Sequence, residues 1–354
     1  MHLRDFDFEL PDERIAQRPR PRGGSRLLVV DRATGTWSES RIADLPSWLR
    51  RGDLLVANDS RVFPARLLGR RAGGGKAECL LLEPAAHDGP ASDQAWWALV
   101  NPGSRLPAGA ILTCTDDQRA PGLELRVHIV ERREDGARLV RLEAAGAGVS
   151  DAIERLGHIP LPPYIRRPDD ADDRLRYQTV FAHQAGSIAA PTAGLHFDDA
   201  LLAALAEAGV ARATVTLHVG YGTFKPVKVD DVRDHRVDAE RYHVAAEVAS
   251  RVRATRTAGG RVLAVGTTTT RVLESAAAPY GGLTAGTGRT DLCILPGHTF
   301  RAVDLLLTNF HLPKSSLLLL VCAFGGRELV LSAYRDAVRR GFHFYSYGDA
   351  MLIL

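Results

Sequence analysis

Three histidines in apolar surroundings are the first candidates for chemistry in this sequence. His196 lies in Leu-His-Phe, His218 in Leu-His-Val and His311 in Phe-His-Leu. We expect these rings at the C-terminal ends of strands, where open α/β sheets bind ligands, with His196 ending a strand and facing a pocket. An imidazole with an unperturbed pKa of about 6.5 is a natural proton acceptor near neutral pH. The alternative interpretation is three ordinary core histidines.

Glycines and threonines near these histidines suit a polar ligand. Gly220 and Gly222 allow a ligand to approach the backbone closely. Four threonines at 267–270 occupy a predicted strand-to-helix turn, and the helix continues through Arg271 and Glu274. Free amides at such a helix start favour an anionic group, although simple helix capping would need only one threonine.

Several common sites are excluded by their missing motifs. The Gly-x-Gly at 220–222 lacks the third glycine and the acidic partner of a dinucleotide fingerprint, and the sequence has no P-loop, nucleophile elbow or His-Glu-x-x-His. The acidic and histidine-rich segment 234–243 matches no metal template, and the four cysteines stand far apart. We therefore expect no metal cofactor.

Composition indicates a globular protein without a membrane span. The 354 residues are 45% apolar and 25% charged, with a net charge of +3, which permits a polyanionic partner without requiring one. The N-terminus lacks an apolar signal region, and the longest apolar run, 317–324, is too short to cross a bilayer. We expect a cytoplasmic protein.

The pattern of strands and helices predicts a layered α/β domain with an inserted all-β domain. Strands are expected at 26–35 and 53–59, with a short helix between them. From 65 to 149, strand-like segments alternate with turns, and Glu134-Asp135-Gly136 is a hairpin signal, which predicts a small barrel. The α/β domain then comprises 1–64 and 150–354.

After residue 150, strands and helices alternate, as expected for helices packed on a sheet. The predicted helices cover 198–209, 239–260, the segment after the threonines, 315–324 and 329–340. The predicted strands cover 211–219, 261–266, 290–295, 303–310 and finally 342–347.

Long segments spread over the whole chain closely resemble the S-adenosylmethionine:tRNA ribosyltransferase-isomerase family. They run in order from end to end and are long enough to be highly specific. These segments are 3–19, 25–32, 58–69, 157–165, 177–182, 186–197, 215–227, 265–275, 296–326 and 344–353.

The resemblance implies an unusual use of S-adenosylmethionine as a co-substrate. Its ribosyl part would be transferred to 7-aminomethyl-7-deazaguanine at the tRNA wobble position and rearranged, giving epoxyqueuosine-tRNA, adenine and methionine. It also implies a two-domain fold with an inserted β-barrel. We expect a monomer whose partner is tRNA. Arginines at 14, 18, 20, 22, 26 and 32, with Arg70-Arg71 and Arg166-Arg167, are candidates for phosphate contacts.

We expect the catalytic residues to be His196, His218 and His311, with His196 or His218 removing a proton from C5′ beside the sulfonium. Loss of adenine, attack by the amine and expulsion of methionine as the epoxide closes would follow. Thr267, Thr268 and Arg271 would hold the methionine carboxylate, and Phe224, Tyr345 or Tyr347 would face the sulfonium. The other expected substrate-binding residues are Thr192, Gly220, Gly222, Thr223, Glu240, Glu274, Asn309 and Asp349.

One position departs from the family pattern. Where the family usually carries His-x-Met-His-x-Glu, residues 235–240 place Asp238 at the second histidine. Two alternatives therefore stay open: a related transferase with a small-molecule acceptor, and a non-catalytic tRNA-binding protein that uses the inserted domain as its platform.

Overall fold

The computed structural model describes residues 1–85, 93–278 and 282–354, without the side chains of Asp93 and Phe224. By its internal contacts the chain divides into two compact units. Unit 1 comprises Met1–Arg61, Pro163–Arg167 and Leu175–Leu354, and unit 2 comprises Val62–Pro162 and Pro168–Arg174. The expected inserted domain of 65–149 lies within unit 2, which also includes a helix and the segment after it.

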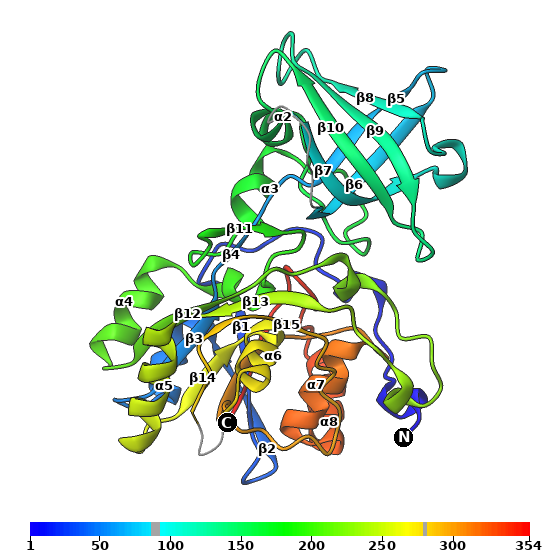
Figure 1. Cartoon of the computed structure of the whole chain (residues 1–354). Helices are drawn as coiled ribbons and strands as arrows, with labels where there is room; N and C mark the ends of the chain where they lie inside the picture. Colours follow the sequence, from blue (N-terminus) through cyan, green and yellow to red (C-terminus); the bar gives the residue numbers. More distant parts are fainter. Residues whose placement is uncertain (86–92, 279–281) are drawn as a thin grey trace. The chain divides into compact units, whose positions relative to one another are not determined.

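Unit 1 is built on a nine-stranded sheet (Figure 1). In spatial order the strands are β15 (Gly286–Thr290), β13 (Glu240–Val244), β12 (Ala211–Leu217), β3 (Leu54–Asn58), β14 (Val262–Val265), β16 (Leu305–Asn309), β17 (Ala350–Ile353), β1 (Arg26–Asp31) and β2 (Thr36–Arg41). The central strands β12, β3, β14 and β16 are parallel to one another, and β17 is parallel to β1. The pairs β15–β13, β13–β12, β16–β17 and β1–β2 are antiparallel. β4 (Ser60–Val62) and β11 (Gln184–Ser187) form a separate two-stranded sheet.

Helices cover both faces of this sheet. Alternate residues of the central strands point to opposite faces, and β3, β14 and β16 are buried on both faces. One face packs on α5 (Ala246–Thr257), α6 (Thr267–Ser275), α7 (Ser316–Gly325) and α8 (Arg327–Arg339). The other packs on α1 (Leu45–Trp48) and α4 (Asp199–Glu207). This arrangement confirms the expected layered α/β fold.

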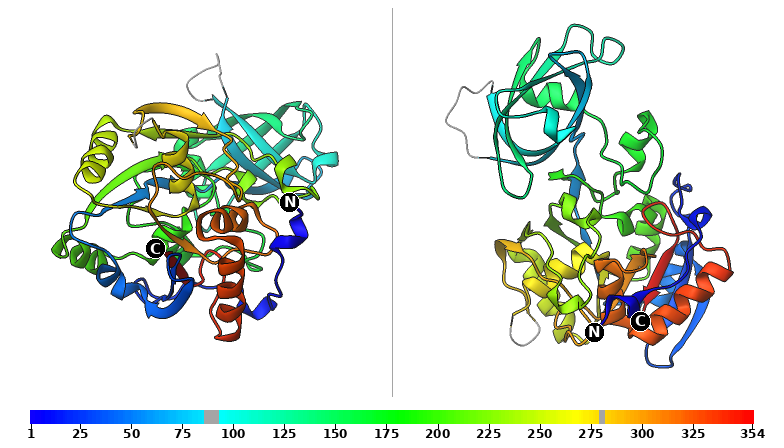
Figure 2. Two further views of the ribbon diagram at one scale, coloured as in Figure 1. Left: turned by 90° about the horizontal axis from the view of Figure 1, so that it is seen from below. Right: turned by 90° about the vertical axis from the view of Figure 1, so that its right-hand side faces the viewer.

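Unit 2 contains a closed six-stranded barrel in the order β10-β7-β6-β5-β8-β9, and its neighbouring strands are antiparallel (Figure 2). Its strands are β5 (Arg66–Arg71), β6 (Lys76–Pro84), β7 (Asp93–Asn101), β8 (Ile111–Thr115), β9 (Glu124–Arg132) and β10 (Arg138–Ala145). The Asp-Gly turn joins β9 to β10 as expected. Helix α2 (Val149–Leu156) contacts β5, β9 and β10, and α3 spans Ala171–Arg176.

Three expected elements were wrong. The predicted helix 239–260 begins as strand β13, because this segment pairs with β12 and β15 before α5 starts at Ala246. The strand expected at 290–295 ends at Thr290, and the last strand is Ala350–Ile353 rather than 342–347. Pairing of β17 with both β1 and β16 explains the last difference, since such long-range contacts override local pattern.

No single helix in the described ranges is long and apolar enough to cross a membrane. The pair α7 and α8 meets the length and composition criterion only together, with a bend of 115° between them.

Candidate active site

A cavity of about 560 Å³ in unit 1 lies where three parallel strands end. Val219 follows β12, Thr267 and Thr268 follow β14, and Thr308, at the end of β16, faces it from a third strand. The C-terminal edge of a parallel sheet is the usual ligand site of such folds.

The start of α6 supplies backbone donors to this cavity. Gly266, with a positive φ of 90°, turns the chain from β14 into the helix, and none of the side chains that the structure describes caps it. The hydroxyls of Thr269 and Thr270 bond backward to carbonyls at 2.7 and 3.0 Å, so they do not cover the first amides. Thr267 and Thr268 line the cavity there. These amides and the helix dipole favour an anionic ligand group.

His311 is the histidine that reaches the cavity wall. Its Nε2 lies 2.9 Å from the Thr308 hydroxyl, and its backbone N–H donates to the Tyr334 hydroxyl at 3.2 Å. Burial lowers the pKa of His311 to about 3, since a charged ring would lose its hydration. The ring is therefore neutral at pH 7 and available as a hydrogen-bond acceptor. Its Nδ1 has no hydrogen-bond partner among the described residues.

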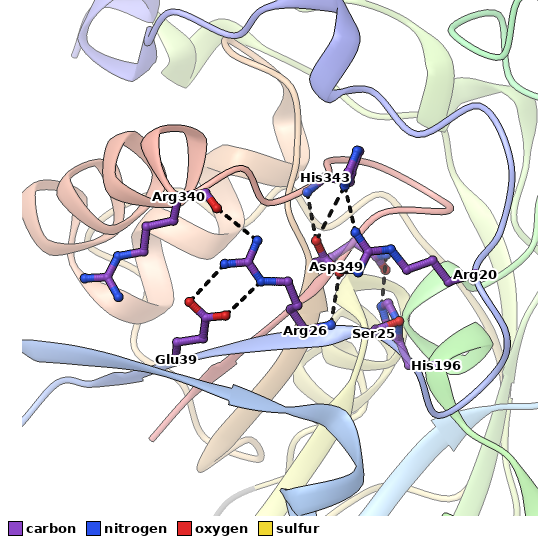
Figure 3. Close-up of polar contacts among 9 residues, drawn as sticks. Arg20, Ser25, Arg26, Glu39, His196, Arg340, His343 and Asp349 are labelled. Atoms are coloured by element: carbon purple, nitrogen blue, oxygen red, sulfur yellow. Dashed lines mark hydrogen bonds and ion pairs between the residues drawn. The ribbon is translucent and has the colours of Figure 1, made fainter.

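His196 is not among the residues that line the cavity, and it bonds instead to neighbouring side chains, one of which is Ser25 (Figure 3). Its Nδ1 lies 2.8 Å from the Ser25 hydroxyl and its Nε2 lies 3.1 Å from Asn309 Nδ2. Burial lowers the pKa of His196 to about 4. The expectation that His196 ends a strand was wrong: it ends the 3-10 helix η5 (Thr192–His196), because the Pro191 segment turns before any strand pairing. Both ring nitrogens are occupied by protein groups.

His218 directly follows β12, as expected, but its ring lines neither this cavity nor the one beside it. Its Nδ1 is buried and has no hydrogen-bond partner in the described part of the chain, and a Cβ built on Gly186 would lie only 2.8 Å from it. Burial, with a smaller effect of Arg241, lowers the pKa of this ring. The structure thus brings one of the three predicted histidines to the cavity, and His196 reaches it only through Asn309.

Asn309 and Thr192 line the cavity and hold each other. The Thr192 hydroxyl donates to Asn309 Oδ1 at 3.1 Å, and Asn309 Nδ2 donates to the Tyr345 carbonyl at 3.0 Å. Both side chains were predicted to bind substrate, and both lie where they can do so.

Aromatic side chains form another part of the wall. The Tyr164 and Tyr345 ring centroids are 3.8 Å apart at 72°, and the Tyr164 hydroxyl bonds to Ser346. Tyr345 has a positive φ of 71°, unusual for a bulky residue, which turns it toward the cavity that Tyr177 also lines. Sequence reasoning assigned no role to Tyr164, Tyr177 or Ser346, although 157–165 and 177–182 belong to the resembling segments.

A second cavity of about 450 Å³ adjoins the first, sharing Thr223 and Leu317 with it. Its wall includes Gly222 and Asp238, together with apolar residues of α7 and of the segment after β15. Phe224 belongs to the same 3-10 helix as Thr223, but its side chain is outside the described part of the structure.

Arg271 and Glu240 bind each other at the wall of the second cavity. The Arg271 guanidinium also donates to the carbonyls of Thr290 and Leu292, and Glu240 Oε1 accepts the Gly220 N–H at 2.7 Å. Burial raises the pKa of Glu240, and the guanidinium opposes that rise. The pair thus connects α6 to β13 and β15. Because the Arg271 guanidinium is already bound by Glu240 and two carbonyls, it is not free to hold a substrate carboxylate.

Four other predicted binding residues lie outside both cavity walls: Gly220, Glu274, Tyr347 and Asp349. Glu274 accepts the backbone N–H groups of 301–303 and holds that loop. Asp349, fully buried, accepts the N–H groups of Arg26 and His343 and pairs with Arg20 at 3.4 Å (Figure 3). Tyr347 faces a separate cavity beside Arg20.

Several of the arginines considered for phosphate binding are occupied by protein groups. Arg26 pairs with Glu39, Arg166 pairs with Asp12, and Arg32 donates to the carbonyls of Leu354 and Asp304. Among the described residues, no group of three or more His, Cys, Asp or Glu side chains is arranged to hold a metal ion.

Comparison with known proteins gives one consistent result. A family model described as "Queuosine biosynthesis protein" matches residues 3–353. The chain is 53% identical to an S-adenosylmethionine:tRNA ribosyltransferase-isomerase of Anaeromyxobacter dehalogenans over 100% of this chain and 99% of that protein, and 48% identical to one of Pelobacter propionicus over the full length of both. The crystal structure of S-adenosylmethionine tRNA ribosyltransferase from Thermotoga maritima is similar, with a TM-score of 0.55, 36% identity and coverage of 99% and 100% of the two chains.

Proposed function

The chain belongs to the S-adenosylmethionine:tRNA ribosyltransferase-isomerase family of queuosine biosynthesis, and from this membership we propose its reaction and the roles of its residues. It transfers and isomerises the ribosyl moiety of S-adenosylmethionine onto 7-aminomethyl-7-deazaguanine at the tRNA wobble position. The products are epoxyqueuosine-tRNA, adenine and methionine. S-adenosylmethionine is a co-substrate in this reaction, and no metal takes part in the proposal.

The cavity beside α6 is the proposed donor site. The methionine carboxylate lies at the first amides of the helix, beside Thr267 and Thr268, where backbone donors and dipole favour negative charge. The faces of Tyr164 and Tyr345 attract the sulfonium by a cation–π interaction, typically about 0.5–2 kcal/mol. Thr192 and Asn309 supply polar groups for the ribose.

His311 is the proposed base. Sulfonium character acidifies the hydrogens on C5′, and the imidazole at the cavity wall accepts one of them. Thr308 holds the ring through Nε2, which leaves Nδ1 for the substrate. His196 acts indirectly in this proposal, by holding the Asn309 amide. Loss of adenine, attack by the acceptor amine and release of methionine with epoxide closure complete the reaction.

The single observation that carries the proposal is that one cavity at the sheet edge combines the uncapped start of α6 with the imidazole of His311. The test is adenine release from S-adenosylmethionine with three acceptors: precursor-containing tRNA, free 7-aminomethyl-7-deazaguanine, and tRNA with guanine at the wobble position. Release with precursor tRNA alone supports the proposal. Release with the free base but not with tRNA would indicate a small-molecule acceptor, and no release with any of them would indicate a non-catalytic protein.

The proposed location is the cytoplasm, because the proposed substrate is tRNA. The proposed state is a monomer. Binding of tRNA should weaken linearly with the logarithm of salt concentration as phosphate contacts release counterions.

A further inference from the structure

The second cavity carries one carboxylate whose partner is exchangeable. Of the residues that line the two adjoining cavities, Asp238 and Glu240 are the acidic ones. Both oxygens of Glu240 are bound by protein donors in the buried pair described above. Asp238 Oδ2 instead accepts from Lys225 Nζ at 2.6 Å, and each of these side chains is 54% exposed.

The backbone at Gly222 passes close to the Asp238 carboxylate. A Cβ built on Gly222 would lie 2.6 Å from Asp238 Oδ2, so the chain passes directly against the carboxylate at this point. The next residue, Thr223, lines both cavities. Asp238 therefore lies beside the boundary between the proposed donor site and the second cavity.

The Lys225–Asp238 ion pair is of a kind that is readily exchanged. An exposed pair of long, mobile side chains contributes little to stability, because water screens the charges and ordering the side chains costs entropy. A second primary ammonium that enters the cavity makes the same contact with the carboxylate, and Lys225 then turns to solvent.

We propose that Asp238 binds the primary ammonium of the acceptor's aminomethyl group, displaces Lys225 from the carboxylate in doing so, and thereby selects the modified base. This inference rests on the proposed function. The apolar residues Leu292, Ile294 and Leu320 in the same cavity suit the planar ring that carries the aminomethyl group. A primary alkyl ammonium keeps its charge at pH 7, so a carboxylate distinguishes it from an unsubstituted guanine.

The donor also carries a primary ammonium, on the carbon next to its carboxylate. With the carboxylate at the start of α6, that ammonium lies in the first cavity, whereas Asp238 lines only the second. The observations therefore favour the acceptor, and the experiment below separates the two sources.

The test compares the affinity of the full-length protein for two tRNAs that differ only in 7-aminomethyl-7-deazaguanine or guanine at the wobble position. Wild-type protein is expected to prefer the aminomethyl tRNA. Asp238→Asn is expected to reduce that preference by about tenfold, the usual scale of a charge-assisted hydrogen bond, without weakening binding of the guanine tRNA. Lys225→Met, which removes the competing ammonium, is expected to increase the preference.

A matched control is available in the Lys314–Asp7 pair. These two side chains are 2.6 Å apart, with exposed fractions of 46% and 44%, and Asp7 lines neither cavity. Asp7→Asn is expected to leave the preference at the wild-type value. Because Asp238 is half exposed, its replacement should also leave the urea unfolding midpoint unchanged.

An unchanged preference in Asp238→Asn would overturn the inference, and so would a loss of S-adenosylmethionine affinity in that variant while the tRNA preference persists. Failure of the proposed function is a separate result. In that case wild-type protein would release no adenine with precursor tRNA, whatever the behaviour of the Asp238 variant.

Discussion

Asn309 donates its side-chain amide to Nε2 of His196 at 3.1 Å and to the Tyr345 carbonyl at 3.0 Å. Since the carbonyl can only accept, the nitrogen of the amide must face it, and His196 Nε2 must accept the second hydrogen. The His196 proton therefore lies on Nδ1 and is donated to Ser25. Protonation of Nε2 would set two N–H groups against each other, so His196 is held neutral.

This arrangement predicts how stability depends on pH. The pKa of His196 is about 4 in the folded chain and about 6.5 in the unfolded chain. Between pH 4 and pH 6.5, the unfolded chain therefore binds a proton at this residue and the folded chain does not. Stability from this group is complete above pH 6.5 and falls by up to about 1.4 kcal/mol per pH unit toward pH 4. Urea unfolding of wild type and His196→Asn measures it. Below pH 6, the free energy of unfolding of the variant should depend less steeply on pH than that of wild type, and above pH 7 the two should have the same slope. Equal slopes below pH 6 would disprove the neutral, buried ring.

The proposed carboxylate site predicts a difference in affinity between two ligands. Decarboxylated S-adenosylmethionine should bind about tenfold more weakly than S-adenosylmethionine, because it makes no contact with the start of α6. Thr267→Pro removes one N–H at the first helical position, where proline is tolerated. In calorimetric titrations this variant should bind S-adenosylmethionine more weakly than wild type and should bind the decarboxylated analogue with unchanged affinity. Equal affinity of wild type for both ligands would rule out this position of the carboxylate.

The Arg271–Glu240 pair predicts a loss of stability on mutation. Arg271→Gln leaves a buried carboxylate without its cation and should reduce the free energy of unfolding by about 3–5 kcal/mol. The double change with Glu240→Gln should recover part of that loss, because no uncompensated charge remains. As a control, Arg251→Gln breaks an exposed pair with Glu247 and should have little effect. A stable Arg271→Gln protein with weakened donor binding would instead support direct substrate contact.

The local pattern of the sequence was enough to predict much of the fold. Apolar runs ended by turn residues identified β1, β3, β14 and β16, and the threonine turn was correctly expected at the start of α6. Segment 239–260 was predicted as one helix because its alanines and charged residues favour helix, and the pairing of β13 with β15 is not visible locally.

The candidate site shows the same limit. His311 was predicted beside a strand end because local sequence places it after β16. The contact between Tyr164 and Tyr345 joins residues far apart in the chain, and only the folded structure reveals it. Likewise, the occupation of both His196 nitrogens depends on Ser25 and Asn309 from two other parts of the chain.

The most direct test of the account is the single-turnover rate of adenine release in His311→Gln with saturating S-adenosylmethionine and precursor tRNA. Loss of a general base predicts a decrease of about 100-fold or more, with donor affinity measured separately and unchanged. His218→Gln, whose ring lines neither cavity, should react at close to the wild-type rate. A wild-type rate in His311→Gln would contradict the assignment of this imidazole as the base.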